Sequence, residues 1–273
     1  MCGTCGCDGQ VPVREQRTEG DSVLVEQDVL AKNDRLAEDN RAWLAEHAVF
    51  AVNLMSAPGS GKTTLLETTV RALAGDVFIG VVEGDQAGSL DADRLRAVDC
   101  RTVQVNTGSG CHLDADMVAR ALRELDPPRG SVAVVENVGN LVCPALFDLG
   151  ERRRVVLVSV TEGEDKPLKY PHMFRAADLV VLTKADLIPH LTFDVDHFAR
   201  HLLRVNPAAE LLVTSCVSGE GLDQWFSWLR SELASVSTPD STAVSSASSA
   251  TSKNPDSPVL PASSPSALPS VSS

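Results

Sequence analysis

The sequence predicts an α/β domain in which helices cover both faces of a mostly parallel sheet of about seven strands. Three observations lead to this fold class. Seven short runs rich in β-branched residues recur along the chain, and continuous apolar runs are typical of strands buried on both faces. Segments with helical periodicity lie between these runs. The composition, 43% hydrophobic and 22% charged, is that of a globular protein and excludes a fully disordered, collagen-like or coiled-coil chain.

The elements follow one another in strand–helix order, as a three-layer domain requires. The expected strands are Phe50–Met55, Val77–Val82, Thr102–Val105, Ser131–Val135, Val155–Val160, Leu179–Leu182 and Leu211–Thr214. Helices are expected between them, among others at Lys62–Leu73 and Leu113–Leu125.

Three segments are expected along the chain. Residues 1–25 hold a cysteine motif and a linker, residues 26–234 form the domain, and residues 235–273 are a Ser/Pro-rich tail that buries too little apolar surface to fold. The domain opens with an amphipathic helix over residues 26–46. Its apolar positions repeat every seven residues, at Val29, Leu36 and Trp43 and at Leu30, Ala37 and Leu44. Packing on the domain edge is the favoured role of this helix, and partner docking is the alternative.

The net charge and the cysteine content limit the classes of partner that we expect. With 24 Lys and Arg against 37 Asp and Glu, the net charge of −13 opposes binding to nucleic acid or to anionic membranes. No apolar run approaches the ~18 to 20 residues that span a bilayer, and no leader pattern opens the chain, so we expect a cytoplasmic protein. Seven cysteines in a reducing compartment indicate metal binding rather than disulfides.

A phosphate-binding loop follows the first strand. Residues 56–64 read Ser-Ala-Pro-Gly-Ser-Gly-Lys-Thr-Thr, with a strand before and a helix after, which is the context a P-loop requires. Backbone N–H groups around Gly59, Ser60, Gly61 and Thr64 would surround the phosphates. Lys62 would neutralise the β- and γ-phosphates, and the Thr63 hydroxyl would bind Mg²⁺. Ser56 stands where the motif has its first glycine.

Two acids at strand ends complete the predicted phosphate site. Glu136 ends the fourth strand and Gly139 follows three residues later, which matches an Asp-x-x-Gly switch with Glu in place of Asp. Asp85, after the second strand, could bind Mg²⁺ directly or through water, or it could cap a helix. We expect Lys62, Thr63, Asp85 and Glu136 to carry catalysis through positioning and charge neutralisation. No residue stands out as a general base, so turnover is expected to be slow.

The base site is expected to prefer guanine. Residues 183–186, Thr-Lys-Ala-Asp, are similar to the Asn-Lys-x-Asp pattern, in which the carboxylate of Asp186 would accept two hydrogen bonds from guanine. The stem of Lys184 would lie over the base. Thr183 replaces the usual Asn, and its hydroxyl makes fewer supporting bonds. Ser215 follows the last strand, where a contact to guanine O6 belongs.

Two groups of cysteine and histidine residues are candidate metal sites. Cys2, Cys5 and Cys7 lie within six residues, and three thiolates with the amine of Cys2 would suit square-planar Ni²⁺, while Zn²⁺ and Cu⁺ remain alternatives. Cys111 and His112 share a loop after the third strand, and Cys143 follows the Glu136–Gly139 switch. These three would meet at the nucleotide edge of a parallel sheet, or they serve separate structural roles.

Taken together, these motifs resemble the nickel-incorporation GTPases of the hydrogenase and urease maturation family over residues 1 to about 234. The resemblance rests on Cys2-x-x-Cys5-Gly6-Cys7, the loop at residues 56–64, Glu83-Gly84-Asp85-Gln86, Cys111-His112-Leu113-Asp114-Ala115, Glu136-Asn137-Val138-Gly139-Asn140-Leu141-Val142-Cys143-Pro144 and the Thr161–Pro171 segment TEGEDKPLKYP. Urease relatives carry Cys-Pro-His, whereas here Cys143-Pro144 precedes Ala145, which favours the hydrogenase branch.

The resemblance implies a P-loop fold of SIMIBI-like class and a GTP- and Mg²⁺-dependent homodimer. It implies that Cys111, His112 and Cys143 of both subunits bind Ni²⁺ or Zn²⁺ at the interface, with a tighter nickel site at the N-terminal cysteines. The partners it implies are the nickel chaperone HypA, the hydrogenase large-subunit precursor and, in some members, the isomerase SlyD. The chain has no His-rich storage tract, so delivery rather than storage is expected.

The expected function is therefore a GTP-driven switch that hands on nickel: γ-phosphate binding moves residues 136–143, and hydrolysis changes the metal site. Differential metal affinity of the two nucleotide states is required for this. Alternatives are a nickel-binding module whose nucleotide site only gates dimerisation, a urease-type nickel-insertion GTPase, and a small-molecule kinase.

Overall fold

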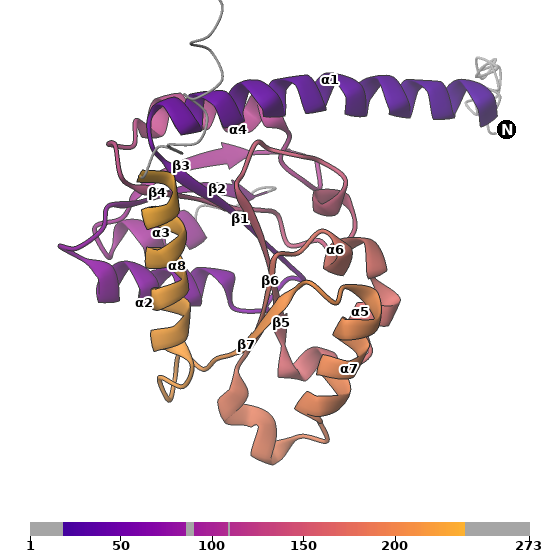
Figure 1. The fold of residues 1–273 in the computed structure, drawn as a ribbon, viewed down its shortest axis with the longest axis vertical. Coiled ribbons are helices and arrows are strands. Elements are labelled where there is room, and N and C mark those ends of the chain that lie inside the picture. The colour runs from indigo at the N-terminus through magenta and orange to yellow at the C-terminus, as the bar shows by residue number, and fades with distance from the viewer. Residues whose placement is uncertain (1–18, 86–89, 109, 238–273) are drawn as a thin grey trace, which may run out of the picture. The chain divides into compact units, whose positions relative to one another are not determined.

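The fold is a single seven-stranded parallel sheet flanked by helices, as a computed structural model shows for residues 19–85, 90–108 and 110–237 (Figure 1). All six strand pairings are parallel, in the order β3-β2-β4-β1-β5-β6-β7. The strands are β1 (Phe50–Ser56), β2 (Ile79–Asp85), β3 (Arg101–Asn106), β4 (Val132–Glu136), β5 (Arg153–Ser159), β6 (Leu179–Thr183) and β7 (Glu210–Val213). The predicted α/β class and strand number are confirmed, with strand ends within three residues of those expected.

Helices alternate with the strands. They are α1 (Glu19–Glu46), α2 (Lys62–Leu73), α3 (Leu90–Arg96), α4 (Ala115–Leu125), α5 (Lys166–Lys169), α6 (Pro171–Arg175), α7 (Val195–Val205) and α8 (Leu222–Ser237), with 3₁₀ turns at Cys143–Ala145, Val160–Glu162 and Ala185–His190. Helix α2 has the predicted bounds. Helix α4 begins at Ala115 rather than Leu113, because the Asp114 side chain accepts a hydrogen bond from the backbone N–H of Met117 and caps the helix there. No helix among the described residues is long and apolar enough to cross a membrane.

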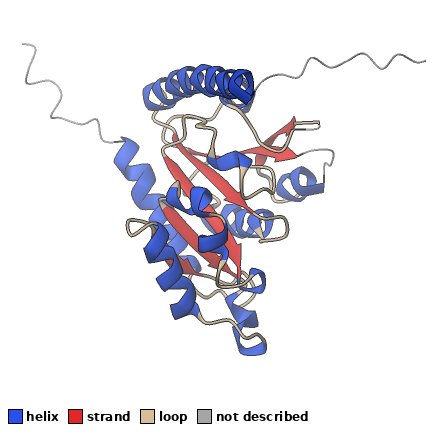
Figure 2. Ribbon diagram, turned by 90° about the vertical axis from the view of Figure 1, so that its right-hand side faces the viewer, coloured by secondary structure: helices blue, strands red, loops and turns tan. Residues whose placement is uncertain are grey.

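Helices cover both faces of the sheet (Figure 2). Alternate residues of the central strands pack in hydrophobic clusters on opposite faces. On one face, Val52 and Leu54 of β1 pack in the cluster that includes Leu65 of α2 and Trp225 of α8. On the other face, neighbouring positions pack against α1 and α4 near the β2 side and against α6 and α7 near the β6 side. Strands covered on both faces are the reason that the sequence shows continuous apolar runs.

The N-terminal helix is longer than expected and mixes polar with apolar residues on its buried face. It begins at Glu19, so the linker predicted up to residue 25 is helical in its last part. Ala37 and Leu44 are buried as predicted, whereas Val29 is 51% exposed. Asn33 and Asn40 share the buried face, each only 5% exposed. Packing on the domain, in contact with α4, is confirmed as a role of this helix.

The candidate motifs of the nucleotide site leave the sheet at one edge, because the strands are parallel and their carboxyl ends coincide. The phosphate loop follows β1, Asp85 ends β2, Glu136 ends β4, and residue 184 follows β6. Strand β1 lies between β4 and β5 in the sheet. The strands β2 to β4 lie on one side of β1 and the strands β5 to β7 on the other, so the phosphate loop lies where the strand order changes direction. Ligands of open parallel sheets bind at such a point.

Candidate nucleotide and metal site

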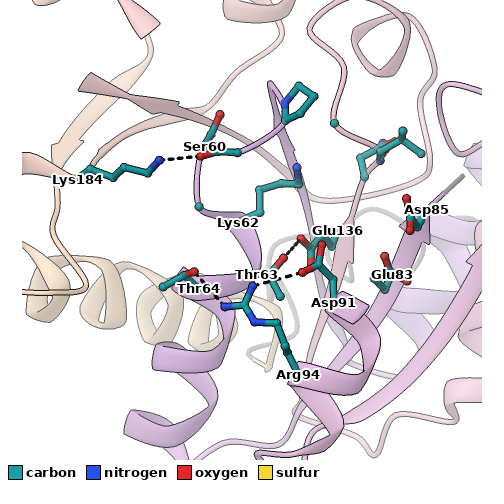
Figure 3. A pocket seen from close by; sticks show the side chains of 17 residues that line it. Ser60, Lys62, Thr63, Thr64, Glu83, Asp85, Asp91, Arg94, Glu136 and Lys184 are labelled. Atoms are coloured by element: carbon teal, nitrogen blue, oxygen red, sulfur yellow. Dashed lines mark hydrogen bonds and ion pairs between the residues drawn. The ribbon is translucent and has the colours of Figure 1, made fainter. Parts of the chain in front are cut away.

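A cavity of about 470 Å³ lies around the phosphate loop, at the carboxyl edge of the sheet (Figure 3). Its lining includes residues 58–64 of the loop, Glu83, Asp85, Asp91 and Arg94 on the β2 side, Glu136–Gly139, and Lys184. The four residues predicted to act in catalysis therefore all line one cavity: Lys62, Thr63, Asp85 and Glu136. Asp186 and Ser215 are not among its lining residues.

The loop holds the shape that anion binding needs. Gly59 and Gly61 have φ values of +77° and +95°, in the left-handed region that side-chain-bearing residues rarely adopt. Helix α2 begins directly after Gly61, so its free N–H groups face the cavity. A Cβ atom at Gly139 would lie 3.1 Å from Pro58, so a side chain here would require the switch segment or the loop to shift by a few tenths of an ångström.

The side chain that replaces the first glycine of the motif has a partner. Lys62 Nζ donates a hydrogen bond to Ser56 Oγ at 2.8 Å, and Ser56 Oγ donates to the Ala57 carbonyl at 2.6 Å. Burial lowers the pKa of the Lys62 ammonium, against the opposing effect of Glu136 and other carboxylates. The turn thus accommodates Ser56 by using its hydroxyl to hold Lys62 over the cavity.

A second contact braces the loop from a distant segment. Ser60 Oγ donates to Glu162 Oε1 at 2.6 Å, and the same carboxylate oxygen accepts from the Ser159 N–H at 2.9 Å. Lys166 Nζ lies 3.4 Å from the other oxygen of Glu162. Glu162 was not among the predicted site residues. It belongs to the TEGEDKPLKYP segment, and nothing in that segment indicates which loop the carboxylate reaches across about 100 residues of sequence.

Four carboxylates gather on the side of the cavity away from Lys184 (Figure 3). Glu136 Oε1 accepts a hydrogen bond of 2.7 Å from Thr63 Oγ1, the predicted Mg²⁺-binding hydroxyl. Glu83 lies beside Glu136 on the adjoining strand, in direct register. One buried oxygen of each, Oε2, has no hydrogen-bond partner. Buried carboxylate oxygens without partners, next to a threonine hydroxyl, are suited to a hard divalent cation such as Mg²⁺.

Sequence reasoning selected Asp85 and Glu136 here and missed Glu83 and Asp91. Glu83 lies inside β2 and is 3% exposed. A single acid inside a strand does not change the hydrophobic pattern of that strand, so the pattern does not mark it as a site residue. Asp91 lies in the first turn of α3, where acids are common for capping reasons alone. Asp85, by contrast, ends β2 and lines the cavity, and the described residues give no helix that begins next to it.

Crowding of the acids changes their protonation in the metal-free protein. Burial, reinforced by the neighbouring Glu136 carboxylate, raises the pKa of Glu83 to about 8. Burial also raises the pKa of Glu136, although Lys62 and the Thr63 hydroxyl oppose this. Ionisation of one carboxyl group raises the pKa of an adjacent one in a site of low dielectric, and a bound cation would offset this repulsion.

This protonation makes the stability of the metal-free protein fall as the pH rises. The folded state keeps a proton on Glu83 up to about pH 8, whereas in the unfolded chain the group ionises near its ordinary pKa of 4.5. Between these values the folded state binds more protons, so the free energy of unfolding should fall by up to about 1.4 kcal/mol per pH unit. Urea unfolding with EDTA from pH 5 to 8.5 measures this slope.

Glu83→Gln should flatten the slope, while Glu124→Gln, on the exposed side of α4, should leave it as in the wild type. A slope that survives Glu83→Gln would assign the proton to another group.

Of the residues predicted to contact the base, Lys184 lies at the opposite end of the cavity. Lys184 Nζ donates to the Gly59 carbonyl at 2.8 Å, which draws its side chain across the loop (Figure 3). Asp186 Oδ1 accepts a short hydrogen bond from Ser215 Oγ, so these two predicted residues are brought together. Thr183 Oγ1 donates to the Ser60 carbonyl at 2.7 Å, so the residue in place of Asn still ties this strand to the phosphate loop.

Cys111, His112 and Cys143 meet as predicted. One potential ligand atom from each lies within 4.8 Å of the others, and among the described residues this is the one such group of three. Ligands of a four-coordinate Zn²⁺ ion lie roughly 3.3–3.8 Å apart, given bonds of about 2.0–2.3 Å. The group is thus near the spacing that a soft divalent cation needs. The predicted ligands Cys2, Cys5 and Cys7 lie outside the described residues.

The surroundings of Cys111 and His112 favour the neutral forms of both side chains. The nearby Cys143 thiol raises the pKa of Cys111, and burial lowers the pKa of His112. Cys111 Sγ lies 3.7 Å from His112 Nδ1, and the His112 ring stacks on Phe147 with centroids 3.9 Å apart. A bound divalent cation would displace the thiol protons, so its affinity should rise with pH.

The cluster adjoins the nucleotide site. A second cavity is lined by Cys111, Asn140 and Val142, and it shares Pro58, Val138 and Gly139 with the first. Asn140 Nδ2 also donates to the Cys111 carbonyl at 3.3 Å. Gly139, which would touch the γ-phosphate, and Cys143, one of the three candidate metal ligands, therefore belong to one short segment, residues 136–143.

Fold and site define a P-loop nucleotide-binding protein with a second cluster of thiol and imidazole ligands. A sequence model of the CobW/HypB/UreG nucleotide-binding domain matches residues 50–213. The chain belongs to the CobW/HypB/UreG family of P-loop GTPases.

Individual relatives place the chain among the HypB proteins. It is 54% identical over 207 residues to the hydrogenase maturation factor HypB of Rhizobium leguminosarum bv. viciae, covering 76% of this chain and 69% of the relative. It is 54% identical over 208 residues to HypB of Escherichia coli K12, covering 76% and 72%.

Two solved structures share this fold. The crystal structure of HypB from Archaeoglobus fulgidus is 42% identical, with a TM-score of 0.70 over 75% of this chain and 100% of that one. HypB from Helicobacter pylori in complex with nickel is 37% identical, with a TM-score of 0.70 over 75% and 96%.

Proposed function

We propose that this chain is a GTP-hydrolysing nickel metallochaperone that delivers Ni²⁺ to the large-subunit precursor of a [NiFe]-hydrogenase. The observation that carries the proposal is the shared wall of the two cavities: Pro58, Val138 and Gly139 face both the phosphate loop and the cavity that reaches Cys111. Relatives named as hydrogenase maturation factors, and one in complex with nickel, support the cargo and its destination.

In this proposal GTP and Mg²⁺ occupy the first cavity, with Mg²⁺ held by Thr63, Glu136 and Asp85. The γ-phosphate contacts Gly139, whose segment leads directly to Cys143. Lys62 and the N–H groups of the loop neutralise charge on the transferred phosphoryl group. No intrinsic base is required, and slow hydrolysis is expected.

Nickel is the cargo and sits on Cys111, His112 and Cys143. Three ligands leave an open coordination position for a ligand from a partner, which a site of transfer needs and a closed structural site lacks. Zn²⁺ would fit the same donors. The proposal includes a homodimer that joins two such clusters, the nickel chaperone HypA as donor or co-deliverer, and SlyD as an accessory partner. A cytoplasmic setting would keep the thiols reduced.

The test is nickel affinity in each nucleotide state, measured by competition with a chromogenic chelator in GDP and in a non-hydrolysable GTP analogue. The proposal expects different affinities in the two states and no difference in Cys111→Ala. A ligand shifts an equilibrium only by its differential affinity, so equal nickel affinity in all states would remove the coupling. If the analogue changes the dimer but not nickel binding, the nucleotide gates assembly alone.

Base selectivity offers a separate check. Asp186→Asn should weaken GTP binding roughly 100-fold or more, because the amide cannot accept both guanine N–H bonds, and it should improve binding of xanthosine triphosphate, whose C2 carbonyl can accept from the amide. Fluorescent nucleotide titration measures both. Asp196→Asn on α7 is the matched control. Equal GTP affinity in Asp186→Asn would place the base elsewhere.

A further inference from the structure

Two buried asparagines of α1 connect the two chain segments that carry the metal ligands. Asn33 Oδ1 accepts from the Ala115 N–H at 2.9 Å, and Asn33 Nδ2 donates to the Asp148 carbonyl at 2.7 Å. Asn40 Nδ2 donates to the Ala115 carbonyl at 2.8 Å and to the Leu149 carbonyl at 3.0 Å. Each asparagine thus bonds to both segments.

These bonds lie close to the ligands in sequence. Ala115 comes three residues after His112 and begins α4, while Asp148 comes five residues after Cys143. Phe147, next to Asp148, stacks on the His112 ring. Both polar groups of the Ala115 backbone are bound by α1, so the start of α4 is fixed relative to the segment after Cys143.

The regular geometry of α1 fixes the distance between the two asparagines. Residues seven apart lie on the same face of a helix, about 10.5 Å apart along its axis. Packing is tight at the same place, since a Cβ atom at Gly150 would lie 2.5 Å from the Ala37 carbonyl oxygen. On the outer side, Arg41 Nη2 binds both carboxylate oxygens of Asp148, at 2.9 and 2.8 Å. The second segment cannot slide along α1 without breaking these contacts.

Two further asparagines hold the segments on the side facing the nucleotide. Asn137 Oδ1 accepts from the Leu113 N–H at 3.2 Å and from the Val138 N–H at 3.0 Å, and Asn140 binds the Cys111 carbonyl. These contacts belong to the switch segment itself and would move with it. The contacts from α1 come from outside the switch, so they define the fixed side of the cluster.

We propose that Asn33 and Asn40 are positioning residues of the metal cluster, which set the separation of Cys111 and His112 from Cys143 and thereby its affinity for a soft divalent cation. The inference rests on the proposed function, because it takes the cluster to bind metal. Neither asparagine touches the ion. Outer residues that orient metal ligands typically change affinity ten- to a hundredfold when replaced.

The experiment uses Co²⁺, whose visible absorption reports thiolate ligation and coordination geometry, on the full chain with GDP and Mg²⁺. Cys2, Cys5 and Cys7 are replaced by Ser so that only the cluster is read. Asn33→Leu and Asn40→Leu are compared with Thr69→Val, which removes a buried hydrogen bond of 2.9 Å from Trp225 Nε1 on the opposite face of the sheet. Thermal unfolding of each variant gives the stability loss.

The proposal expects Co²⁺ and Ni²⁺ affinity to fall roughly ten- to a hundredfold in both asparagine variants, with an altered Co²⁺ spectrum. Thr69→Val should lose similar stability and keep both properties. Unchanged affinity and spectrum in a folded asparagine variant would overturn the proposal, as would an equal loss in Thr69→Val. If Asn40→Leu does not fold, Asn33→Leu decides alone. If the unsubstituted cluster binds no Co²⁺ or Ni²⁺, the proposed function itself fails.

Discussion

Lys62→Ala is expected to reduce GTP hydrolysis by roughly 100-fold or more. Lys62 Nζ lies over the cavity, held by Ser56 Oγ, and is the ammonium group expected to meet the β- and γ-phosphates. Removing one preorganised charge-stabilising group typically costs ~10²–10³ in rate. Single-turnover hydrolysis of radiolabelled GTP with Mg²⁺ gives the rate, and equilibrium dialysis gives the loss of binding.

The control for Lys62→Ala is Lys32→Ala, which removes an exposed lysine of α1 away from the cavity. It should leave turnover unchanged. Wild-type turnover in Lys62→Ala would mean that the measured hydrolysis takes place outside this cavity, and the assignment of the nucleotide site would fail with it.

Cys111→Ala is expected to weaken metal binding at the cluster strongly, because it leaves two ligands where three had met. Thiolates supply most of the affinity of such a site for soft divalent cations, so the fall should be of the order of 100-fold or more. Competition with a chelator of known affinity measures it, in a chain without the N-terminal cysteines. Nucleotide binding should persist because the phosphate loop is untouched.

Cys216→Ala is the control for Cys111→Ala. Burial raises the pKa of the Cys216 thiol, and it does not belong to the group of three. Its replacement should leave metal affinity as in the wild type. Equal loss in both variants would show that metal affinity reflects general thiol content and not a built site.

Residue patterns were sufficient to predict the fold class and the phosphate loop. Strands buried on both faces require unbroken apolar runs, so Val155 to Ser159 can be identified as part of a strand from its own sequence. The order of the strands in the sheet cannot be predicted from these runs, because the runs are chemically alike and their pairing depends on how the helices between them pack.

The missed residues share a physical cause. Asn33 and Asn40 lie in a polar stretch of α1, where asparagine ordinarily marks a solvent-facing position, and only their partners at Ala115 and residues 148–149 reveal that they are buried. Glu83 and Glu162 act across strands or loops distant in sequence. The local sequence pattern indicates which residues can take part in chemistry. It does not indicate which distant carbonyl or hydroxyl group their side chains contact.

The contact between α1 and the segment after Cys143 also sets an order of events during synthesis. Asn33 and its partner Asp148 are 115 residues apart in the chain. At about 5–20 residues per second, a ribosome needs roughly 6 to 23 seconds to make the second after the first. Throughout that interval α1 has no complete docking site, and Cys111 is made well before Cys143. The ligand cluster can thus form only after Cys143 has been made, when β1 to β4 have been synthesised and β5 to β7 have not.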